Sequence, residues 1–199
     1  MTRIKICGIT DIEDAMMATE LGADAIGFIL APSKRRITPD AARAIIEKLP
    51  PIITIVGVFM DARFDEVNQI ADYTKIDVVQ LHGNEPPEYC DRIKRNVIKR
   101  ISVTENDTTE ILASRMAKYR VPAYLLDPGA GSGNVFNWHL ARGIDLPLMI
   151  AGGLTPDNVK DAVRLLNPYG VDVVSGVETS LGKKDKEKVK RFIAGVRSC

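Results

Sequence analysis

The side chain best placed to do chemistry is the thiol of Cys7. It ends a short apolar strand predicted over residues 3–7, and Gly8 beside it lets backbone approach a ligand closely. Thr10 and Glu13 fit a T-x-x-E capping box and predict that a helix starts directly afterwards. The thiol is therefore expected at the carboxyl end of a strand. A buried structural cysteine is the alternative, since cysteine is among the most buried residue types.

A second candidate is Asp127, which follows the apolar run 124–126. A carboxyl group there would be partly desolvated, and the resulting raised pKa would suit a general acid. A carboxylate that caps neighbouring backbone is the structural alternative.

Two pairs of small residues indicate an anion site. Gly152-Gly153 and Ser175-Gly176 follow apolar strands and can offer unhindered backbone N–H groups, as do the loops after the last two strands of many barrels. Residues 177–181 are expected to form the short helix of such a site. Glycines that merely end strands are the alternative.

Further polar residues follow other strands. Arg35 and Arg36 fit a carboxylate or a second anion, because a planar guanidinium can bind a carboxylate through two nitrogens; a solvated loop is the alternative. Gln80 and His82 end the fourth strand, and His82 is either a ligand contact or a satisfied residue of the rim. Residues 129–133 lack the G-K-[ST] ending of a P-loop and are expected to form a flexible lid or loop rather than a nucleotide site.

Eight apolar strands alternating with helical segments must position these groups. Most strands are near-continuous in Ile and Val, which is typical of parallel strands covered on both faces. They are predicted over 3–7, 25–30, 52–59, 77–81, 97–101, 123–127, 148–151 and 172–175. Apolar spacing at i, i+3, i+4 and i+7 predicts helices over 42–49, 159–166 and 189–196.

Helix starts are predicted at two matching Thr-Pro-Asp sequences. Thr38 and Thr155 would be the N-caps, with Pro39 and Pro156 at the first helical position. The mixed charges of residues 183–188 are expected to be the solvated first turns of the last helix.

The eight repeating units predict a compact, single-domain (β/α)8 TIM barrel over residues 1–199, with some short or irregular helices. A doubly wound open sheet is the rival, disfavoured because no G-x-G-x-x-G follows the first strand. In such a barrel, Cys7 and Asp127 would be a base and an acid on opposite sides of one mouth. The sequence fixes no histidine partner for a thiol-protease-like pair, and a thiol with an ordinary pKa of ~8.5 can also act, as its thiolate, to remove a proton. The pattern therefore favours isomerisation of a phosphorylated substrate over acyl transfer.

Composition narrows the class of protein. The net charge of +1 gives no sign of a nucleic-acid or membrane partner, and no long apolar run is present. The three cysteines are odd in number and far apart, which indicates a reducing compartment and a cytoplasmic protein without disulfides. With two histidines, His82 and His139, a histidine-based metal site is not expected.

The motifs, in order, resemble those of the phosphoribosylanthranilate isomerase family of tryptophan biosynthesis along the whole chain. The matching segments are KICGIT at 5–10, GADAIGF at 22–28, SKRRI at 33–37, VQLHGNE at 79–85, LLD at 125–127, GSG at 131–133, AGGLTPDNV at 151–159 and DVVSGVE at 172–178. The resemblance implies the Amadori rearrangement of N-(5-phosphoribosyl)anthranilate to 1-(2-carboxyphenylamino)-1-deoxyribulose 5-phosphate, without a cofactor.

The resemblance also implies roles for particular residues. Asp127 would protonate the furanose ring oxygen as general acid, and Cys7 would remove the sugar C2 proton as general base. Arg35 would hold the anthranilate carboxylate, with Arg36 as the alternative. The phosphate would lie on Gly152, Gly153, Ser175 and Gly176, and Gln80 and His82 would line the substrate pocket.

Two rival functions remain open on the sequence. The first is the related aminoaldose isomerase of histidine biosynthesis, or an enzyme of both pathways; those use two aspartates and a second phosphate site, whereas here the first strand ends in Cys7. The second is a catalytically silent phosphate-binding domain, which would need neither Cys7 nor Asp127. The protein is expected to be a monomer or a homodimer.

Overall fold

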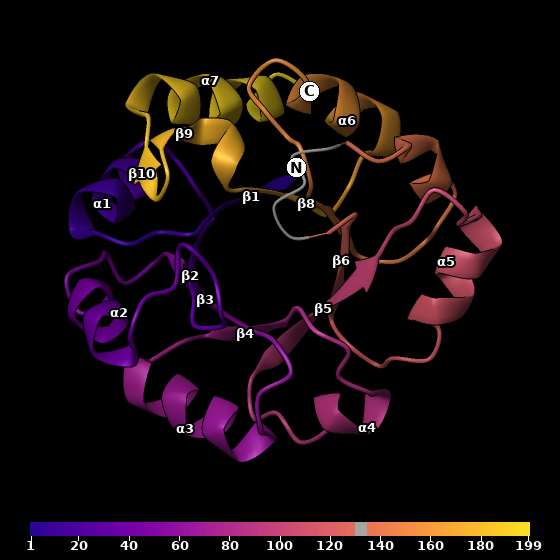
Figure 1. Ribbon diagram of the computed structural model, residues 1–199. Coiled ribbons are helices and arrows are strands. Elements are labelled where there is room, and N and C mark those ends of the chain that lie inside the picture. Colours follow the sequence, from indigo (N-terminus) through magenta and orange to yellow (C-terminus); the bar gives the residue numbers. More distant parts are fainter. Residues whose placement is uncertain (130–134) are drawn as a thin grey trace.

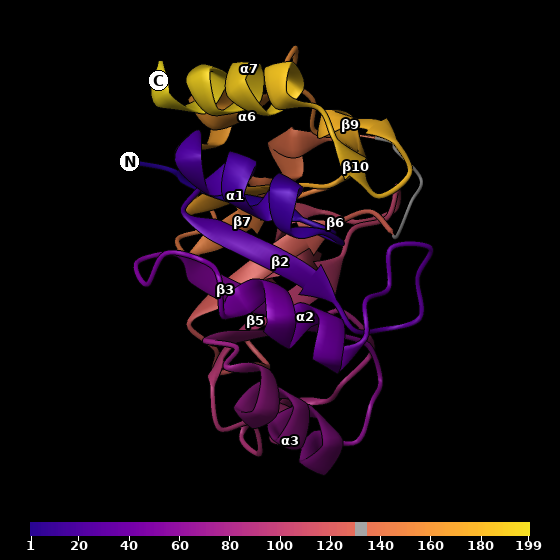
Figure 2. The same cartoon turned by 90° about the vertical axis from the view of Figure 1, so that its left-hand side faces the viewer.

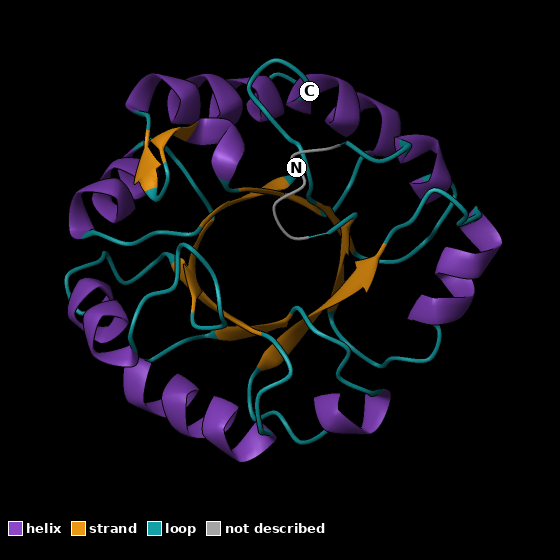
Figure 3. Cartoon of the chain, viewed as in Figure 1, coloured by secondary structure: helices purple, strands orange, loops and turns teal. Residues whose placement is uncertain are grey.

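Eight parallel strands form a closed barrel at the centre of the molecule. The computed structural model describes residues 1–129 and 135–199, and helices surround the ring of strands (Figures 1 and 3). The strand order is β1 to β8, with β8 pairing back onto β1. The strands are β1 (Arg3–Cys7), β2 (Ala25–Ile29), β3 (Thr54–Phe59), β4 (Val78–Leu81), β5 (Asn96–Ser102), β6 (Ala123–Asp127), β7 (Leu148–Ile150) and β8 (Gly170–Val173).

The helices of the outer layer vary in length. They are α1 (Ile12–Glu20), α2 (Pro39–Ile46), α3 (Phe64–Thr74), α4 (Pro87–Cys90), α5 (Thr109–Met116), α6 (Val159–Leu166) and α7 (Lys186–Arg197), with 3-10 turns η1 (Trp138–Ala141) and η2 (Ser175–Val177). The predicted (β/α)8 barrel with short or irregular helices is confirmed.

The alternation of side chains along each strand separates two apolar regions. Ile4 and Ile6 of β1 point outward and are fully buried in the larger core against the helices. Leu125, Met149 and Ala151 belong to a smaller cluster inside the barrel. Lys5 and Cys7, which alternate with these two residues along β1, therefore belong to the barrel interior.

Two predicted helix starts are wrong. The N-cap of α1 is Asp11, whose carboxylate accepts from the Asp14 amide, while the Thr10 hydroxyl donates to the Gly182 carbonyl. At α6, residues 156–158 form a turn in which the Asn158 side chain accepts from the Thr155 amide, and the helix begins at Val159 with no side-chain hydrogen bond at its cap. The predicted Thr38 cap of α2 is confirmed.

The segment after β8 also differs from the prediction. Residues 177–181 do not form a helix, because Glu178–Ser180 is the strand β9, and it pairs with β10 (Lys183–Lys184). The predicted solvated run at 183–188 is wrong at Lys184, which is buried and pairs with Glu178. This hairpin lies beside α1 (Figures 1 and 2), where the Lys184 amide donates to Asp14.

The predicted boundaries of two strands are wrong by two residues. The eighth strand, expected over 172–175, is β8 at Gly170–Val173, and Val174 leads into the turn η2 that begins at Ser175. Ile52 was expected in the third strand but is 94% exposed, in the turn that precedes β3. Pro50 and Pro51 come directly before it, and the Ile53 amide closes a turn onto the Pro50 carbonyl. Hydrophobicity alone could not distinguish this exposed apolar residue from the strand that follows.

Candidate active site

A cavity of about 550 Å³ opens at the carboxyl ends of the barrel strands. In (β/α)8 barrels this is the face that carries function. All but one of the residues that the sequence singled out for a site lie on its wall: Cys7, Arg35, Gln80, His82, Asp127, Gly152, Gly153, Ser175 and Gly176. Arg36 is exposed and does not line the cavity.

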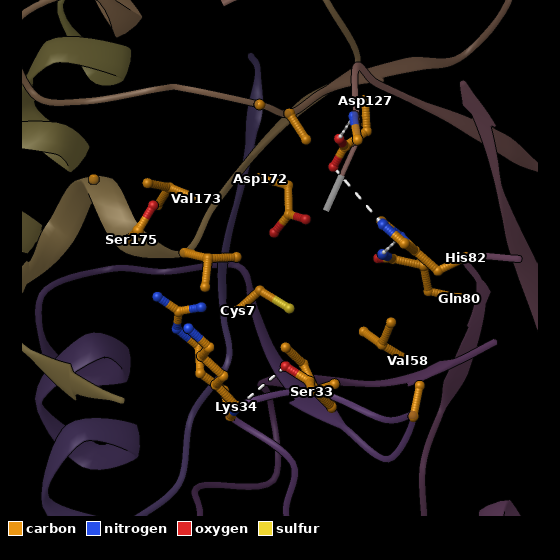
Figure 4. A pocket seen from close by; sticks show the side chains of 18 of the residues that line it. Cys7, Ser33, Lys34, Val58, Gln80, His82, Asp127, Asp172, Val173 and Ser175 are labelled. Carbon is orange, nitrogen blue, oxygen red and sulfur yellow. Dashed lines mark hydrogen bonds and ion pairs between the residues drawn. The ribbon is translucent and has the colours of Figure 1, made fainter. Parts of the chain in front are cut away.

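The Cys7 thiol lies at the end of β1 and points toward the cavity (Figure 4). The residue is 2% exposed, and burial raises the pKa of its thiol above the ordinary value. The ammonium of Lys5 opposes this shift, because a nearby positive charge favours the thiolate.

A buried ion pair lies next to the thiol. Lys5 and Asp172 are register partners on β1 and β8, and Lys5 Nζ donates to Asp172 Oδ1 at 2.9 Å. Burial alone would lower the pKa of Lys5, but the charges of Asp172 and Cys7 raise it above its ordinary value. The lysine is therefore an ammonium at neutral pH, one side-chain position below Cys7 on the inner face of β1.

Asp127 lies across the cavity from Cys7, at the end of β6 (Figure 4). Its Oδ1 accepts a hydrogen bond from the Gly129 amide at 2.7 Å, which fixes the carboxyl group. Its Oδ2 lies 3.9 Å from His82 Nε2. The second oxygen thus remains available on the cavity side. Gly129 is the one residue of the expected lid within the described chain; 130–133 lie outside it.

His82 is neutral at physiological pH. Burial, and then the charge of Arg100, lower its pKa from 6.5 to about 4. The Gln80 amide nitrogen lies 3.1 Å from His82 Nδ1, so Nδ1 is the acceptor and the ring proton is on Nε2, facing Asp127. The imidazole can therefore donate one hydrogen bond into the cavity but adds no charge there.

Arg35 brings a cation to the cavity from the loop after β2. Its Nε and Nη2 donate to the two carboxylate oxygens of Glu178 at 2.8 and 2.7 Å. The hydrogen bonds from Glu178 raise the pKa of Arg35, so the guanidinium stays charged. Arg35 is thus held by one carboxylate while it lines the cavity.

The loops after β7 and β8 present backbone to the cavity. Gly152 and Gly153 have φ values of 83° and 65°, in the left-handed region that favours glycine. Their amides donate to none of the described residues. At Gly176, a Cβ atom would lie 1.9 Å from the Leu154 carbonyl oxygen, so only glycine fits between these two loops. Unpaired amides beside closely packed backbone suit an anion such as phosphate.

Three residues of the site were missed by sequence reasoning. Lys5 could have been found from the strand alternation, since it is two residues before Cys7 and shares its face. Asp172 and Glu178 lie in a segment that was singled out as a motif, but no local pattern says that the first pairs with Lys5 and the second with Arg35. Both pairs join residues more than 140 positions apart.

The other cysteines and the tryptophan lie outside the cavity. Cys90 is buried in α4, Cys199 is exposed, and Trp138 packs against the larger core. Among residues 1–129 and 135–199, no group of acidic, histidine or cysteine side chains could hold a metal ion. Within the same residues, no helix is long and apolar enough to cross a membrane. The fold and the site together define a (β/α)8-barrel enzyme with ionisable side chains facing one cavity.

Comparison with known proteins identifies the family. The model of the N-(5'-phosphoribosyl)anthranilate isomerase family matches residues 4–195. The isomerase of Geotalea uraniireducens is 51% identical, over 97% of each chain. The crystal structure of the isomerase from Thermus thermophilus superposes with a TM-score of 0.91 at 40% identity, over 99% of each chain.

A further solved isomerase carries a ligand. It is described as a complex with reduced 1-(o-carboxyphenylamino)-1-deoxyribulose 5-phosphate, and it matches at a TM-score of 0.89 and 39% identity over the whole of both chains. The chain belongs to the phosphoribosylanthranilate isomerase family, whose members act in tryptophan biosynthesis.

Proposed function

We propose that the protein catalyses the Amadori rearrangement of N-(5-phosphoribosyl)anthranilate, with Asp127 as general acid and Cys7 as general base. The single observation that carries the proposal is the position of a carboxyl group and a thiol on opposite walls of one cavity (Figure 4). Family membership, and the ligand in the relative's complex, support the substrate.

The first step is ring opening. Asp127 donates its proton to the furanose ring oxygen, the C1–O bond breaks, and the nitrogen lone pair forms a protonated Schiff base with C1. The hydrogen bond from Gly129 holds one oxygen of Asp127, which leaves the other to carry the proton. Positioned proton transfer of this kind contributes typically ~10²–10⁴-fold to a rate.

The second step removes the C2 proton. The thiolate of Cys7 takes the proton, and the C2–H electron pair forms a C1=C2 bond while the nitrogen regains its lone pair. The resulting enolamine tautomerises: C1 gains a proton, the C2 hydroxyl loses one, and the ketone forms. The substrate nitrogen is the electron sink, so the proposed sequence uses no cofactor.

The charge of the Schiff base assists the base. The buried ammonium of Lys5 already favours the thiolate of Cys7, and the cationic intermediate adds a second positive charge that favours it further. On the opposite wall, His82 is neutral, so it places no positive charge beside Asp127. The thiol can thus remain protonated in the ligand-free protein, and when the cationic intermediate lowers its pKa the proton can pass to water in the open cavity.

The ends of the substrate have matching groups on the cavity wall. The amides of the two glycine-containing loops suit the 5-phosphate, and the guanidinium of Arg35 suits the anthranilate carboxylate. Because Arg35 lines the cavity and Arg36 does not, we assign the carboxylate to Arg35. Gln80 and His82 would contact the sugar between them.

The test is an assay of the purified protein with freshly generated phosphoribosylanthranilate. The loss of anthranilate fluorescence is followed, and the product is identified by NMR. We expect loss far above the spontaneous rate and a single 1-amino-1-deoxyketose product. Folded protein that gives no loss above the spontaneous rate would contradict the proposal and favour the silent phosphate-binding domain.

A further inference from the structure

The side chain of Glu178 is buried between two cations that come from different segments. On one side Arg35 donates to it through Nε and Nη2, and on the other Lys184 Nζ donates to Oε1 at 3.0 Å. Burial alone would raise the pKa of Glu178, but the hydrogen bonds and charges of Arg35 and Lys184 lower it, so the carboxylate is ionised. Glu178 is 8% exposed and does not line the cavity.

The geometry of the Arg35–Glu178 pair leaves part of the guanidinium free. Arginine has five N–H donors in a fixed planar fork. Glu178 takes the side made by Nε and Nη2, and Nη1 of Arg35 donates to none of the residues that the structure describes. The end of the fork that includes Nη1 is therefore available to a second carboxylate, with the orientation of the plane already set.

Glu178 also connects the two ends of the cavity. It follows η2 directly, so it is two residues from Gly176, whose backbone packs against the Leu154 carbonyl. Lys184 fixes the same segment by donating to the Val174 carbonyl at 3.1 Å. Glu178 thus holds the guanidinium at a set distance from the loops with the free amides.

We propose that Glu178 is a positioning residue that makes Arg35 a receptor for a carboxylate, and that it thereby determines specificity for substrates with a carboxylate on the aromatic ring. This inference rests on the proposed function. Without Glu178, Arg35 would lose its two charge-assisted hydrogen bonds and many more rotamers would be open to it. The cost falls on ligands that use the guanidinium and spares those that do not.

The test compares two ligands that differ in one group. The first is the reduced product, 1-(2-carboxyphenylamino)-1-deoxyribulose 5-phosphate after reduction; the second is its phenylamino counterpart without the carboxylate. Their Kd values are measured by calorimetry for the wild type, Glu178→Gln and Glu178→Asp. Asp107→Asn is the matched control, because Asp107 is a buried carboxylate with two hydrogen bonds from Arg115 outside the cavity.

The wild type is expected to prefer the carboxylate ligand by ~10- to 100-fold, the range for hydrogen bonds to charged groups. In Glu178→Gln we expect the preference to fall to about twofold, with the phenylamino ligand bound almost as before. Glu178→Asp should restore part of the preference, and it keeps the test informative if the Gln variant does not fold. Asp107→Asn should keep the full preference.

Three results would overturn the inference. One is an unchanged preference in both Glu178 variants, and another is equal weakening of both ligands, which indicates a structural role alone. The third is an active wild type that does not distinguish the ligands. A wild type that binds neither ligand and has no isomerase activity would instead overturn the proposed function on which the inference rests.

Discussion

Lys5 lies in the barrel interior, but its charge lowers the pKa of the neighbouring Cys7 thiol. A lysine in an apolar interior would ordinarily lose its charge, but the ion pair with Asp172 keeps it protonated. The ammonium then acts on Cys7, the next residue on the same face of β1. The sequence therefore places a thiol-activating cation two residues from the thiol.

Replacing Lys5 by Met should raise the pKa of Cys7 above its already raised value. Iodoacetamide reacts with the thiolate, so the rate against pH reports that pKa. In a Cys90→Ala, Cys199→Ala background, we expect the midpoint of the Lys5→Met profile to move to higher pH. The double variant Lys5→Met, Asp172→Asn should show a smaller rise, because Asp172 itself raises the pKa of Cys7. A midpoint that is unchanged or moves to lower pH would contradict this account.

At the scale of the elements, the loops after β7 and β8 depend on one close approach. Gly176 lies where a Cβ would meet the Leu154 carbonyl oxygen at 1.9 Å. Gly176→Ala must therefore shift one loop against the other, and a displacement near 1 Å can cost ~100-fold in a catalysed rate. We expect weaker binding of the reduced product and a lower melting temperature. Wild-type affinity in this variant would contradict the assignment of these loops to the phosphate.

Elements that are specified by local sequence patterns were predicted, and those that depend on contacts distant in sequence were not. Strands and the Thr38 cap were predicted because apolar runs and an N-cap with Pro are local signals. The hairpin β9–β10 was missed because it is stabilised by contacts distant in sequence: Lys184 binds Asp14 of α1 as well as Glu178. A charged run beside an apolar helix stripe has the same local appearance whether or not a lysine within it is buried.

In the site, too, local patterns were predictable and contacts between distant residues were not. Positions at strand ends were predictable, because the barrel gathers the carboxyl ends of its strands at one face. The pairs Lys5–Asp172 and Arg35–Glu178 were not, because they depend on β8 closing onto β1 and on the path of the loop beyond β8.

For the whole molecule, His82 makes stability depend on pH. Its pKa is about 4 in the folded protein and 6.5 as a free side chain, so the unfolded chain binds the proton first as the pH falls. The free energy of unfolding should thus decrease from pH 6.5 to 4, by a total of about 3 kcal/mol. Urea unfolding of wild type and His82→Gln across this range measures the effect, and the variant should be less sensitive to pH. The exposed His139→Gln is the matched control; equal pH dependence in all three proteins would contradict the prediction.

The most direct test of the central claim separates chemistry from binding in Cys7→Ala and Asp127→Ala. Turnover of phosphoribosylanthranilate and the Kd of the reduced product are measured for both variants, with Cys90→Ala as a control thiol outside the cavity. We predict that each site variant loses ~10²–10⁴-fold in kcat while its Kd stays within about threefold of wild type, and that Cys90→Ala retains both. Near-wild-type turnover in either site variant would contradict the acid–base assignment.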